Sequence, residues 1–337
     1  MTNACNAQTQ PRSGGQILSL GELLVDLIPV ENGGRIEKTG AVLKVASGSA
    51  GIFACAISAL GAKSGFLGKV GKDALSRMVY DTIQEFGVDM RHVVTSGEGQ
   101  IGLAFIEYLP DGRRNYEYYR SHSVGSLFRA EELDTEAFDG AYALHFPGML
   151  LDLSPELREA SLFAARTAKE KGVLLSFDPN IRTELNRKES MERMIGVIRM
   201  ADIIAPTLAE GRMITGKESV GDVLRALHDL GPAVVALTMD KDGAAVSSAG
   251  QVALCEGIDV PVVDPTGAGD TFAAALVVAL QRGMSLSDTA LFCNCAGTLV
   301  VTKRGVIGQA IPTLAEISAL METKPCKMRL VALSELE

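Results

Sequence analysis

Short apolar runs alternate with helix-forming segments along the second half of the chain. A Ser154-Pro155 pair supplies an N-cap and a first helical residue, and Gly172 follows the last turn of that helix. Residues 173–177 are then short and apolar, as expected of a strand buried on both faces. The same order recurs, with helices at about 190–200 and 220–230 and strands at 202–205 and 233–238. This alternation predicts an α/β fold whose parallel or mixed sheet is covered by helices on both faces.

The first half of the chain adds a hairpin. Residues 101–109 and 113–119 flank the turn signal at 110–112, which reads Pro-Asp-Gly. Together with 25–36 and 42–45, these segments predict a small sheet inserted into the main domain. We expect such a sheet to serve as a lid or as an oligomer surface.

The composition fits one globular unit. Of the 337 residues, 47% are apolar and 22% are charged, and no repeat or linker separates two domains. We therefore expect a disordered tail at 1–15, one domain at 16–320 and a C-terminal tail at 321–337. The formal net charge of −9 argues against duplex DNA or an anionic membrane as the main partner. Small anionic ligands stay open, because backbone dipoles or a metal ion can bind them locally.

The cysteines and the N-terminus indicate a cytoplasmic protein. None of the six cysteines forms a CxxC pair, and most lie in apolar surroundings, so buried free thiols in a reducing compartment are expected. Residues 1–15 are polar, unlike a signal peptide or a membrane anchor. The four histidines show no metal-ligand spacing.

A glycine-rich turn carries the clearest chemical signal. Residues 260–263 read as a buried strand, and residues 264–270, DPTGAGD, follow as a turn. The stretch 271–280 is apolar all round and ends at Gly283, as expected of a buried helix. Residues 267–269 (Gly, Ala, Gly) therefore lie at a helix N-terminus with little side-chain bulk. Their N–H groups and the helix dipole would form an anion hole for a phosphoryl group.

Asp270 lies on the first turn of the same helix. A carboxylate there can accept the proton of an attacking hydroxyl while the neighbouring amides hold the transferred phosphoryl group. The alternative is a turn whose aspartate only caps the helix. The preceding strand, the two aspartates at 264 and 270, and the buried helix favour the catalytic interpretation.

This loop resembles the C-terminal signature of the ribokinase-type (phosphofructokinase-B) carbohydrate kinases. The resemblance extends over about residues 17–313 and includes four further segments: GELLVD (21–26), GFLGKVG (65–71), DPNIR (178–182) and TKRG (302–305). It implies a ribokinase-like three-layer α/β/α sandwich with a small β-sheet lid at about 25–46 and 100–125. It also implies ATP and Mg²⁺ as cofactors, Asp270 as the base, and Gly267, Ala268 and Gly269 as the anion hole. Asp264 would lie beside a monovalent-cation site that holds K⁺.

The resemblance places sugar contacts in the first half of the chain. Asp26 would accept two sugar hydroxyl hydrogen bonds; the alternative is a strand-end turn residue. Gly48 belongs to the first family signature, where small residues let a sugar approach the backbone. Ser47 and Ile52 depart from that signature, since the family has glycine and asparagine there.

Two arginines are further candidates for the sugar pocket. Arg120 closes the second hairpin strand, and Arg182 follows a buried strand. A guanidinium can grip a carboxylate or donate to a neutral sugar. The competing interpretations are a surface arginine at 120 and a structural ion pair at 182.

The nucleotide and metal contacts are expected in the second half. Glu210 would bind Mg²⁺ through water, with Thr207 where the family has asparagine. Thr238 and Gly243 flank a nucleotide-side loop in which Asp240 replaces a glycine. Asn294 would lie near the adenine, unless it instead contacts a neighbouring loop.

The motifs most resemble those of fructokinases, which predicts transfer of the ATP γ-phosphate to a primary hydroxyl of a six-carbon sugar. A 2-keto-3-deoxygluconate kinase is the close alternative, because the hairpin segment of those kinases also resembles residues 118–120 and 123–126, and because fructokinases carry aspartate where Gly125 stands. A catalytically silent sugar-binding relative and a nucleoside kinase of the same fold also stay open. A homodimer formed through the lid is a further expectation.

Overall fold

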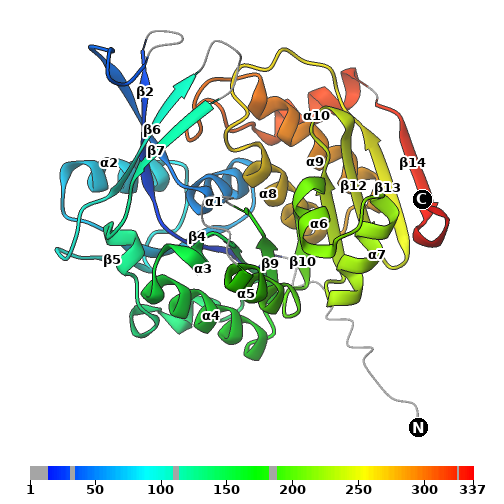
Figure 1. The fold of residues 1–337 in the computed structure, drawn as a ribbon, viewed down its shortest axis with the longest axis horizontal. Helices are drawn as coiled ribbons and strands as arrows, with labels where there is room; N and C mark the ends of the chain where they lie inside the picture. Colours follow the sequence, from blue (N-terminus) through cyan, green and yellow to red (C-terminus); the bar gives the residue numbers. More distant parts are fainter. Residues whose placement is uncertain (1–13, 31–34, 109–113, 182–187, 325) are drawn as a thin grey trace.

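A ten-stranded sheet forms the centre of the computed structural model, which describes residues 14–30, 35–108, 114–181, 188–324 and 326–337 (Figure 1). In spatial order the strands are β14 (Met328–Ala332), β13 (Gln251–Glu256), β12 (Gly243–Ser248), β11 (Val234–Thr238), β10 (Ile203–Ile204), β9 (Leu174–Asp178), β8 (Ala143–Pro147), β1 (Ile17–Leu20), β4 (Ser64–Val70) and β5 (Val93–Thr95). Pairing is parallel from β5 to β11 and antiparallel from β11 to β14. The mixed sheet expected from the alternating pattern is confirmed.

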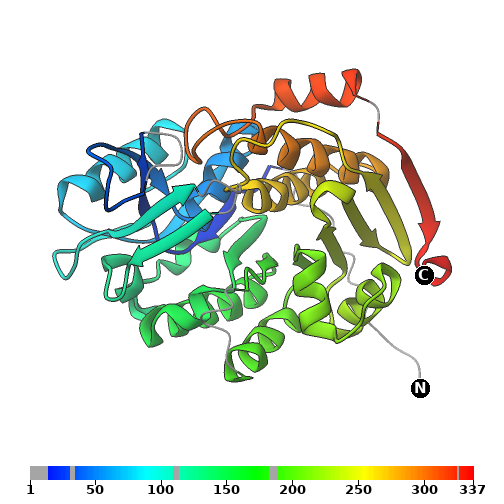
Figure 2. The same cartoon turned by 45° about the horizontal axis from the view of Figure 1, so that its top comes forward.

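Helices cover both faces of this sheet. One face carries α1 (Ser49–Ala59), α2 (Ala74–Glu85), α8 (Ala268–Gln281), α9 (Leu286–Val301) and α10 (Leu314–Thr323). The other carries α3 (Leu150–Leu153), α4 (Pro155–Glu170), α5 (Lys188–Ile198), α6 (Leu208–Thr215) and α7 (Val220–Leu230). Figure 2 shows the yellow-to-orange helices and the green helices on opposite sides of the strands. Each layer packs on its own hydrophobic core, which confirms the three-layer α/β/α sandwich. No helix of the described residues is long and apolar enough to cross a membrane.

A second, four-stranded sheet lies beside the main one. Its order is β3 (Val42–Ser47), β2 (Leu24–Pro29), β6 (Gly102–Tyr108) and β7 (Arg114–Tyr119), and Figure 1 shows it above α1 and α2. β6 and β7 pair antiparallel, as the hairpin prediction required. The predicted turn at 110–112 falls outside the described residues, and β2 ends earlier than the strand expected at 25–36. We refer to this sheet as the lid.

Local capping explains why the predicted helix boundaries hold. The Ser154 hydroxyl accepts from the N–H of Leu157 at 3.0 Å, and Pro155 is the first residue of α4. Gly172, which follows the C-cap residue Lys171, has a φ of 67°, a left-handed conformation that favours glycine. α7 ends at Gly231. These termini are set by residues adjacent in sequence, so their positions can be inferred without the tertiary structure.

Two predictions of local structure are wrong. Residues 260–263 form no strand, and Val262 and Val263 are 65% and 51% exposed. Residues 321–337 are not a tail, because they contain the end of α10 and β14, which pairs with β13. The two errors are related, since β14 occupies the sheet edge beside β13 and leaves 260–263 to cross the surface. The N-terminal segment 1–13 lies outside the described residues.

Candidate active site

The phosphate loop ends at the N-terminus of α8. Gly267 is the N-cap and has a φ of 82°, in the left-handed region where a side chain is strained. Within the described part of the chain, the N–H groups of Gly267 and Gly269 donate to no protein acceptor. Both groups lie at the start of the 14-residue helix α8. The loop therefore presents unsatisfied hydrogen-bond donors at the positive end of the helix dipole.

Asp270 lies on the first turn of α8 and is 9% exposed. The hydroxyl of Ser49, the first residue of α1, donates to Asp270 Oδ1. This contact fixes the carboxylate at the point where the N-termini of α1 and α8 meet. Asp270 is therefore both oriented and close to the open N–H groups of the loop.

A cavity of about 280 Å³ lies between the lid and the carboxyl ends of the main strands. Its lining includes the predicted sugar-side residues Asp26, Gly48 and Arg120. It also includes the predicted phosphate, metal and nucleotide residues Glu210, Thr238, Gly267, Gly269 and Asp270. The structure thus brings together residues from both ends of the chain. Arg182 lies outside the described residues.

Asp26, on β2, is 3% exposed and faces this cavity. Burial raises the pKa of Asp26 to about 7; a hydrogen bond from Ser47 opposes this shift, and the charge of Asp264 adds to it. When Asp26 is ionised, its carboxylate has free lone pairs and few water molecules around it. It is therefore a strong acceptor for the hydroxyl groups of a ligand.

Gly48 adopts a backbone conformation that other residues rarely take. Its φ is 114°, and a Cβ there would lie 2.6 Å from the carbonyl oxygen of Glu22. Glycine is needed at this position because the chain passes so close to the segment before β2. Ile52, which departs from the family signature, packs against the loop: its Cγ2 would lie 3.3 Å from a Cβ at Gly267. Ile52 therefore replaces the polar side chain of the family signature with an apolar side chain that packs against the loop.

Arg120 follows β7 and is 8% exposed. Its Nη1 donates to Glu22 Oε1 at 2.8 Å, and its guanidinium carbon lies 4.1 Å from the centre of the Tyr118 ring. Burial raises the pKa of Glu22, while Arg120 acts to lower it. The sequence motifs point to Arg120 as a site residue but not to Glu22, although Glu22 belongs to the GELLVD segment.

Arg114, at the start of β7, connects the lid to the phosphate loop. It donates to the hydroxyl of Thr266, and its Nη1 lies 3.5 Å from Asp264 Oδ1. Thr266 Oγ1 in turn donates to Asp264 at 2.6 Å, and Gly305 N donates to the other carboxylate oxygen at 3.2 Å. Asp264 thus organises the loop. Its role beside a monovalent cation stays a prediction, and no motif or spacing in the chain indicates Arg114.

Three carboxylates gather on the nucleotide side of the cavity. Burial raises the pKa of Asp178 well above its usual range, and the charges of Glu210 and Asp270 raise it further. Glu210 accepts from the N–H groups of Ile181 at 2.6 Å and Thr207 at 2.8 Å. Clustered carboxylate oxygens of this kind suit Mg²⁺, which neutralises their repulsion. Among the described residues, no group of three or more His, Cys, Asp or Glu side chains is placed to hold a metal ion.

The remaining nucleotide-side predictions fall into two groups. Thr238 lines the cavity at the end of β11. Asp240 has a φ of 51°, so it keeps the left-handed backbone that a glycine would adopt there. Gly243 and Asn294 lie outside the cavity lining: a Cβ at Gly243 would meet the Cys255 carbonyl at 2.0 Å, and Asn294 Nδ2 donates to Glu256 O at 3.0 Å. Their contact with a nucleotide stays a prediction.

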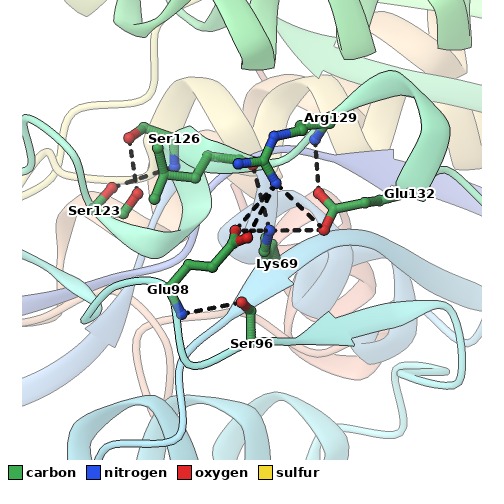
Figure 3. Close-up of polar contacts among 8 residues, drawn as sticks. Lys69, Ser96, Glu98, Ser123, Ser126, Arg129 and Glu132 are labelled. Carbon is green, nitrogen blue, oxygen red and sulfur yellow. Dashed lines mark hydrogen bonds and ion pairs between the residues drawn. The ribbon is translucent and has the colours of Figure 1, made fainter.

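A buried lysine organises a polar cluster outside the cavity (Figure 3). Lys69 Nζ lies 2.7 Å from both Glu98 Oε2 and Glu132 Oε1, and its side chain is fully buried. Arg129 Nη1 lies 3.1 Å from the same Glu98 oxygen. The cluster joins β4 to the segment that follows Ser123. None of these four side chains lines the cavity.

Phosphoryl transfer is the chemistry for which this cavity is suited, because it sets an anion-binding helix start beside an oriented carboxylate base. Fold and site together define a ribokinase-like kinase. The chain belongs to the pfkB family of carbohydrate kinases, which it matches over residues 15–314. It is therefore an ATP-dependent carbohydrate kinase.

Individual relatives agree with this assignment. The chain is 33% identical to fructokinase-1 of Zea mays over 91% of its own length and 97% of that protein. It resembles the structure of a ribokinase II from E. coli in complex with ATP and Mg²⁺, with a TM-score of 0.86, 26% identity, and coverage of 91% and 99% of the two chains. It also resembles 2-dehydro-3-deoxygluconokinase of Thermotoga maritima, with a TM-score of 0.85, 25% identity, and coverage of 91% and 98%.

Proposed function

We propose that this chain is a fructokinase, which transfers the γ-phosphate of ATP to a primary hydroxyl of fructose. The observation that carries the proposal is the placement of Asp270, held by Ser49 beside the N-terminus of α8 in a cavity that Asp26 also faces. The similarity to the fructokinase of Zea mays supports fructose as the acceptor.

In the proposed reaction Asp270 accepts the proton of the attacking hydroxyl. The N–H groups of Gly267 and Gly269 stabilise the charge that develops on the transferred phosphoryl group. Glu210 and Asp178 would hold Mg²⁺ through water, and the ion would offset the negative charge of the phosphates. The lid covers the sugar and excludes water, which limits hydrolysis of ATP.

The charge of the cavity favours an uncharged sugar. Among the described lining residues, four are acidic (Asp26, Asp178, Glu210 and Asp270) and two are basic (Arg114 and Arg120). Both arginines lie against a carboxylate, of Asp264 and Glu22 respectively. Neither arginine therefore offers an uncompensated positive charge to a sugar acid, whereas the hydroxyls of fructose can hydrogen-bond to Asp26 and Arg120.

The alternative acceptor is 2-keto-3-deoxygluconate. The similarity to the 2-dehydro-3-deoxygluconokinase favours it, together with the position of Arg120, since a guanidinium binds carboxylates well. A nucleoside would need an open aromatic face. Tyr116 and Tyr118 line the cavity, but the Arg120 guanidinium covers Tyr118.

Three further properties belong to this proposal. We propose K⁺ beside Asp264, a cytoplasmic location without nucleic-acid or membrane partners, and a homodimer formed through the lid. Exposed apolar side chains on β3 and β7 support the dimer, since Val42, Leu43 and Tyr119 are 42%, 48% and 60% exposed.

The test is ADP release measured with fructose, 2-keto-3-deoxygluconate, ribose, tagatose and nucleosides. Fructose should give the highest kcat/KM. Strong turnover of the ketodeoxy acid with none of fructose would replace the proposed acceptor by the alternative.

A further inference from the structure

Two free thiols meet at the edge of the main sheet, near the end of β13. Cys255, on β13, is 1% exposed, and Cys326, between α10 and β14, is partly exposed. Their Sγ atoms lie 2.8 Å apart, although 71 residues separate them in sequence. Figure 1 shows β13 and β14 side by side, and Cys326 Sγ also lies 4.0 Å from the Sδ of Met328. The pairing of these two strands therefore brings both sulfurs within reach of one another.

The two thiols differ in their access to solvent. Cys326 is partly exposed and can meet a dissolved oxidant, whereas Cys255 is closed off. Burial raises the pKa of the Cys255 thiol, so Cys255 stays protonated and Cys326 reacts first. A separation of 2.8 Å is no longer than the roughly 3–3.5 Å at which bound groups react with each other. Cys326 is thus the attacking cysteine and Cys255 the resolving one.

With hydrogen peroxide as the oxidant, a disulfide forms in two steps. The Cys326 sulfur attacks one peroxide oxygen, the O–O bond breaks, and Cys326 becomes a sulfenic acid while one water leaves. The Cys255 sulfur then attacks the sulfur of Cys326, and the S–OH bond breaks. The thiol proton of Cys255 leaves with the hydroxide as a second water. Two thiols thereby lose two electrons, and the peroxide is reduced to two waters.

Asn294 connects Cys255 to the nucleotide side of the molecule. Its Nδ2 donates to Cys255 Sγ at 3.2 Å and to Glu256 O at 3.0 Å, and Asn294 is 8% exposed. The two sulfurs of a disulfide lie only about 2.05 Å apart, so Cys255 Sγ must move toward Cys326 when the bond forms. Oxidation therefore removes one of the two contacts that orient the amide of Asn294, the residue expected to lie near the adenine.

We propose that Cys255 and Cys326 form a reversible disulfide when the protein meets a peroxide, and that this bond weakens ATP binding through Asn294. Disulfides in a reducing compartment are typically transient and redox-sensing, because cellular thiols break them again. The effect on ATP rests on the proposed nucleotide contact of Asn294. The formation of the disulfide does not depend on that contact.

Cys295, beside Asn294 on α9, is the rival partner for Cys326. Burial raises the pKa of the Cys295 thiol to about 12, and the nearby Cys326 adds to this shift. Cys295 is fully buried, as Cys255 is. Cys255 is favoured because its sulfur is in direct contact with that of Cys326, so their bond needs the smallest movement. The experiment must therefore identify which two cysteines are joined.

Peptide mapping identifies the bond. The full chain carrying Cys5→Ser, which removes the cysteine outside the described residues, is treated with hydrogen peroxide, alkylated and digested without reductant. One pair of peptides joined through Cys255 and Cys326 is expected, and dithiothreitol should separate it. Cys326→Ser should prevent this link, while Cys295→Ser should leave it intact. A link between Cys326 and Cys295, or no disulfide at all, would overturn the inference.

Calorimetry then measures ATP binding to the reduced and the oxidised protein, with Mg²⁺ and without a sugar. The Kd for ATP should rise about two- to tenfold on oxidation, as expected for the loss of one hydrogen bond. Peroxide should not change the Kd of Cys326→Ser. Asn294→Ala should raise the Kd in the reduced form, and oxidation should then add no further change. Equal Kd values for the two redox forms of the chain with Asn294 intact would refute the link to ATP binding.

These two measurements separate the inference from the proposed function. The mapping experiment requires no turnover and no sugar, so a wrong acceptor leaves the test of the disulfide unchanged. If the chain turns over no fructose but the Kd for ATP still depends on the redox state, the fructokinase proposal fails and the inference stands. If fructose is turned over and no Cys255–Cys326 link forms, the inference fails alone.

Discussion

The two walls of the cavity are built in different ways. The phosphate wall consists of one short loop and a helix N-terminus, in which backbone N–H groups of Gly267 and Gly269 and one nearby side chain do the chemistry. The sugar wall consists of side chains from separate parts of the lid, such as Asp26 on β2 and Arg120 directly after β7. The first is specified within seven consecutive residues, and the second depends on contacts across about 100 residues of sequence. We expect the phosphate wall to control kcat and the sugar wall to control KM.

The largest effect should come from the base of the phosphate wall. Asp270→Asn removes the proton acceptor while keeping its shape, so kcat should fall by about 10²–10⁴-fold with little change in the sugar KM. Steady-state ADP release measures both constants. Asp139→Asn is the matched control, because that carboxylate is 69% exposed and pairs with Lys171 at the surface. An unchanged kcat in Asp270→Asn would show that the base is elsewhere.

How much of the molecule can be predicted from the sequence follows the same division. The caps of α4 and α7 and the loop at 264–270 are local, and the structure places them as expected. The contact of Arg114 with Thr266 joins residues 152 positions apart, and that of Arg120 with Glu22 joins residues 98 apart. No spacing rule within a segment reports such pairs. They depend on how the lid folds over the main sheet.

The wrong strand at 260–263 has the same physical origin. An apolar run is compatible with a buried strand, but burial also requires a free position in a sheet. β14 fills the position next to β13, and the backbone of Val263 instead donates to Val301 O at 2.7 Å. Residues 328–332 are predicted from the sequence to be part of a tail because β13, the strand that pairs with them, lies about 75 residues earlier in the sequence. Competition between segments for one edge cannot be read from either segment alone.

The next largest effect should come from the sugar wall. Asp26→Asn loses a charged acceptor for sugar hydroxyls, so the KM for fructose should rise about 100-fold while kcat changes much less. In the wild type the sugar KM should fall as the pH rises through 7, because the pKa of Asp26 is raised to about 7 and only its ionised form is the strong acceptor. A KM that is flat between pH 6 and 8 would contradict this assignment.

The same variant should change stability in the opposite sense. The folded protein keeps a proton on Asp26 up to about pH 7, whereas the unfolded chain releases it near pH 4. Ionisation therefore lowers the free energy of unfolding as the pH rises from 4 to 7. Asp26→Asn should be more stable than the wild type above pH 7 by about 2–4 kcal/mol, and the difference should vanish toward pH 4. Urea denaturation at several pH values measures it.

A smaller effect is expected where the two walls meet. Arg114→Ala removes the guanidinium that contacts Thr266 and the buried carboxylate of Asp264, so the free energy of unfolding should fall by about 1.5–3 kcal/mol. Because the lid loses its contact with the loop, kcat/KM should fall about tenfold, through both constants. Arg91→Ala is the control: Arg91 is 80% exposed and its ion pair with Asp89 is screened by water, so its loss should cost much less stability than the loss of Arg114. Equal losses in the two variants would show that the lid is not coupled to the loop through Arg114.

The smallest effect should come from Asp240, which departs from the family pattern but keeps the backbone of that pattern. Its φ of 51° lies in a region where a residue other than glycine is strained. Asp240→Gly should therefore relieve strain in the folded protein. The greater conformational freedom of glycine in the unfolded chain opposes this gain. The free energy of unfolding of this variant should therefore differ from that of the wild type by less than about 1 kcal/mol. Asp240→Ala keeps the strain and removes the carboxylate, which separates backbone from charge. If the backbone is what this loop contributes, both variants should keep the KM for ATP within about twofold of the wild type. A large rise in the KM for ATP in both variants would instead show that the carboxylate of Asp240 takes a direct part in nucleotide binding. The nucleotide end of the cavity would then depend on side chains, as the sugar wall does.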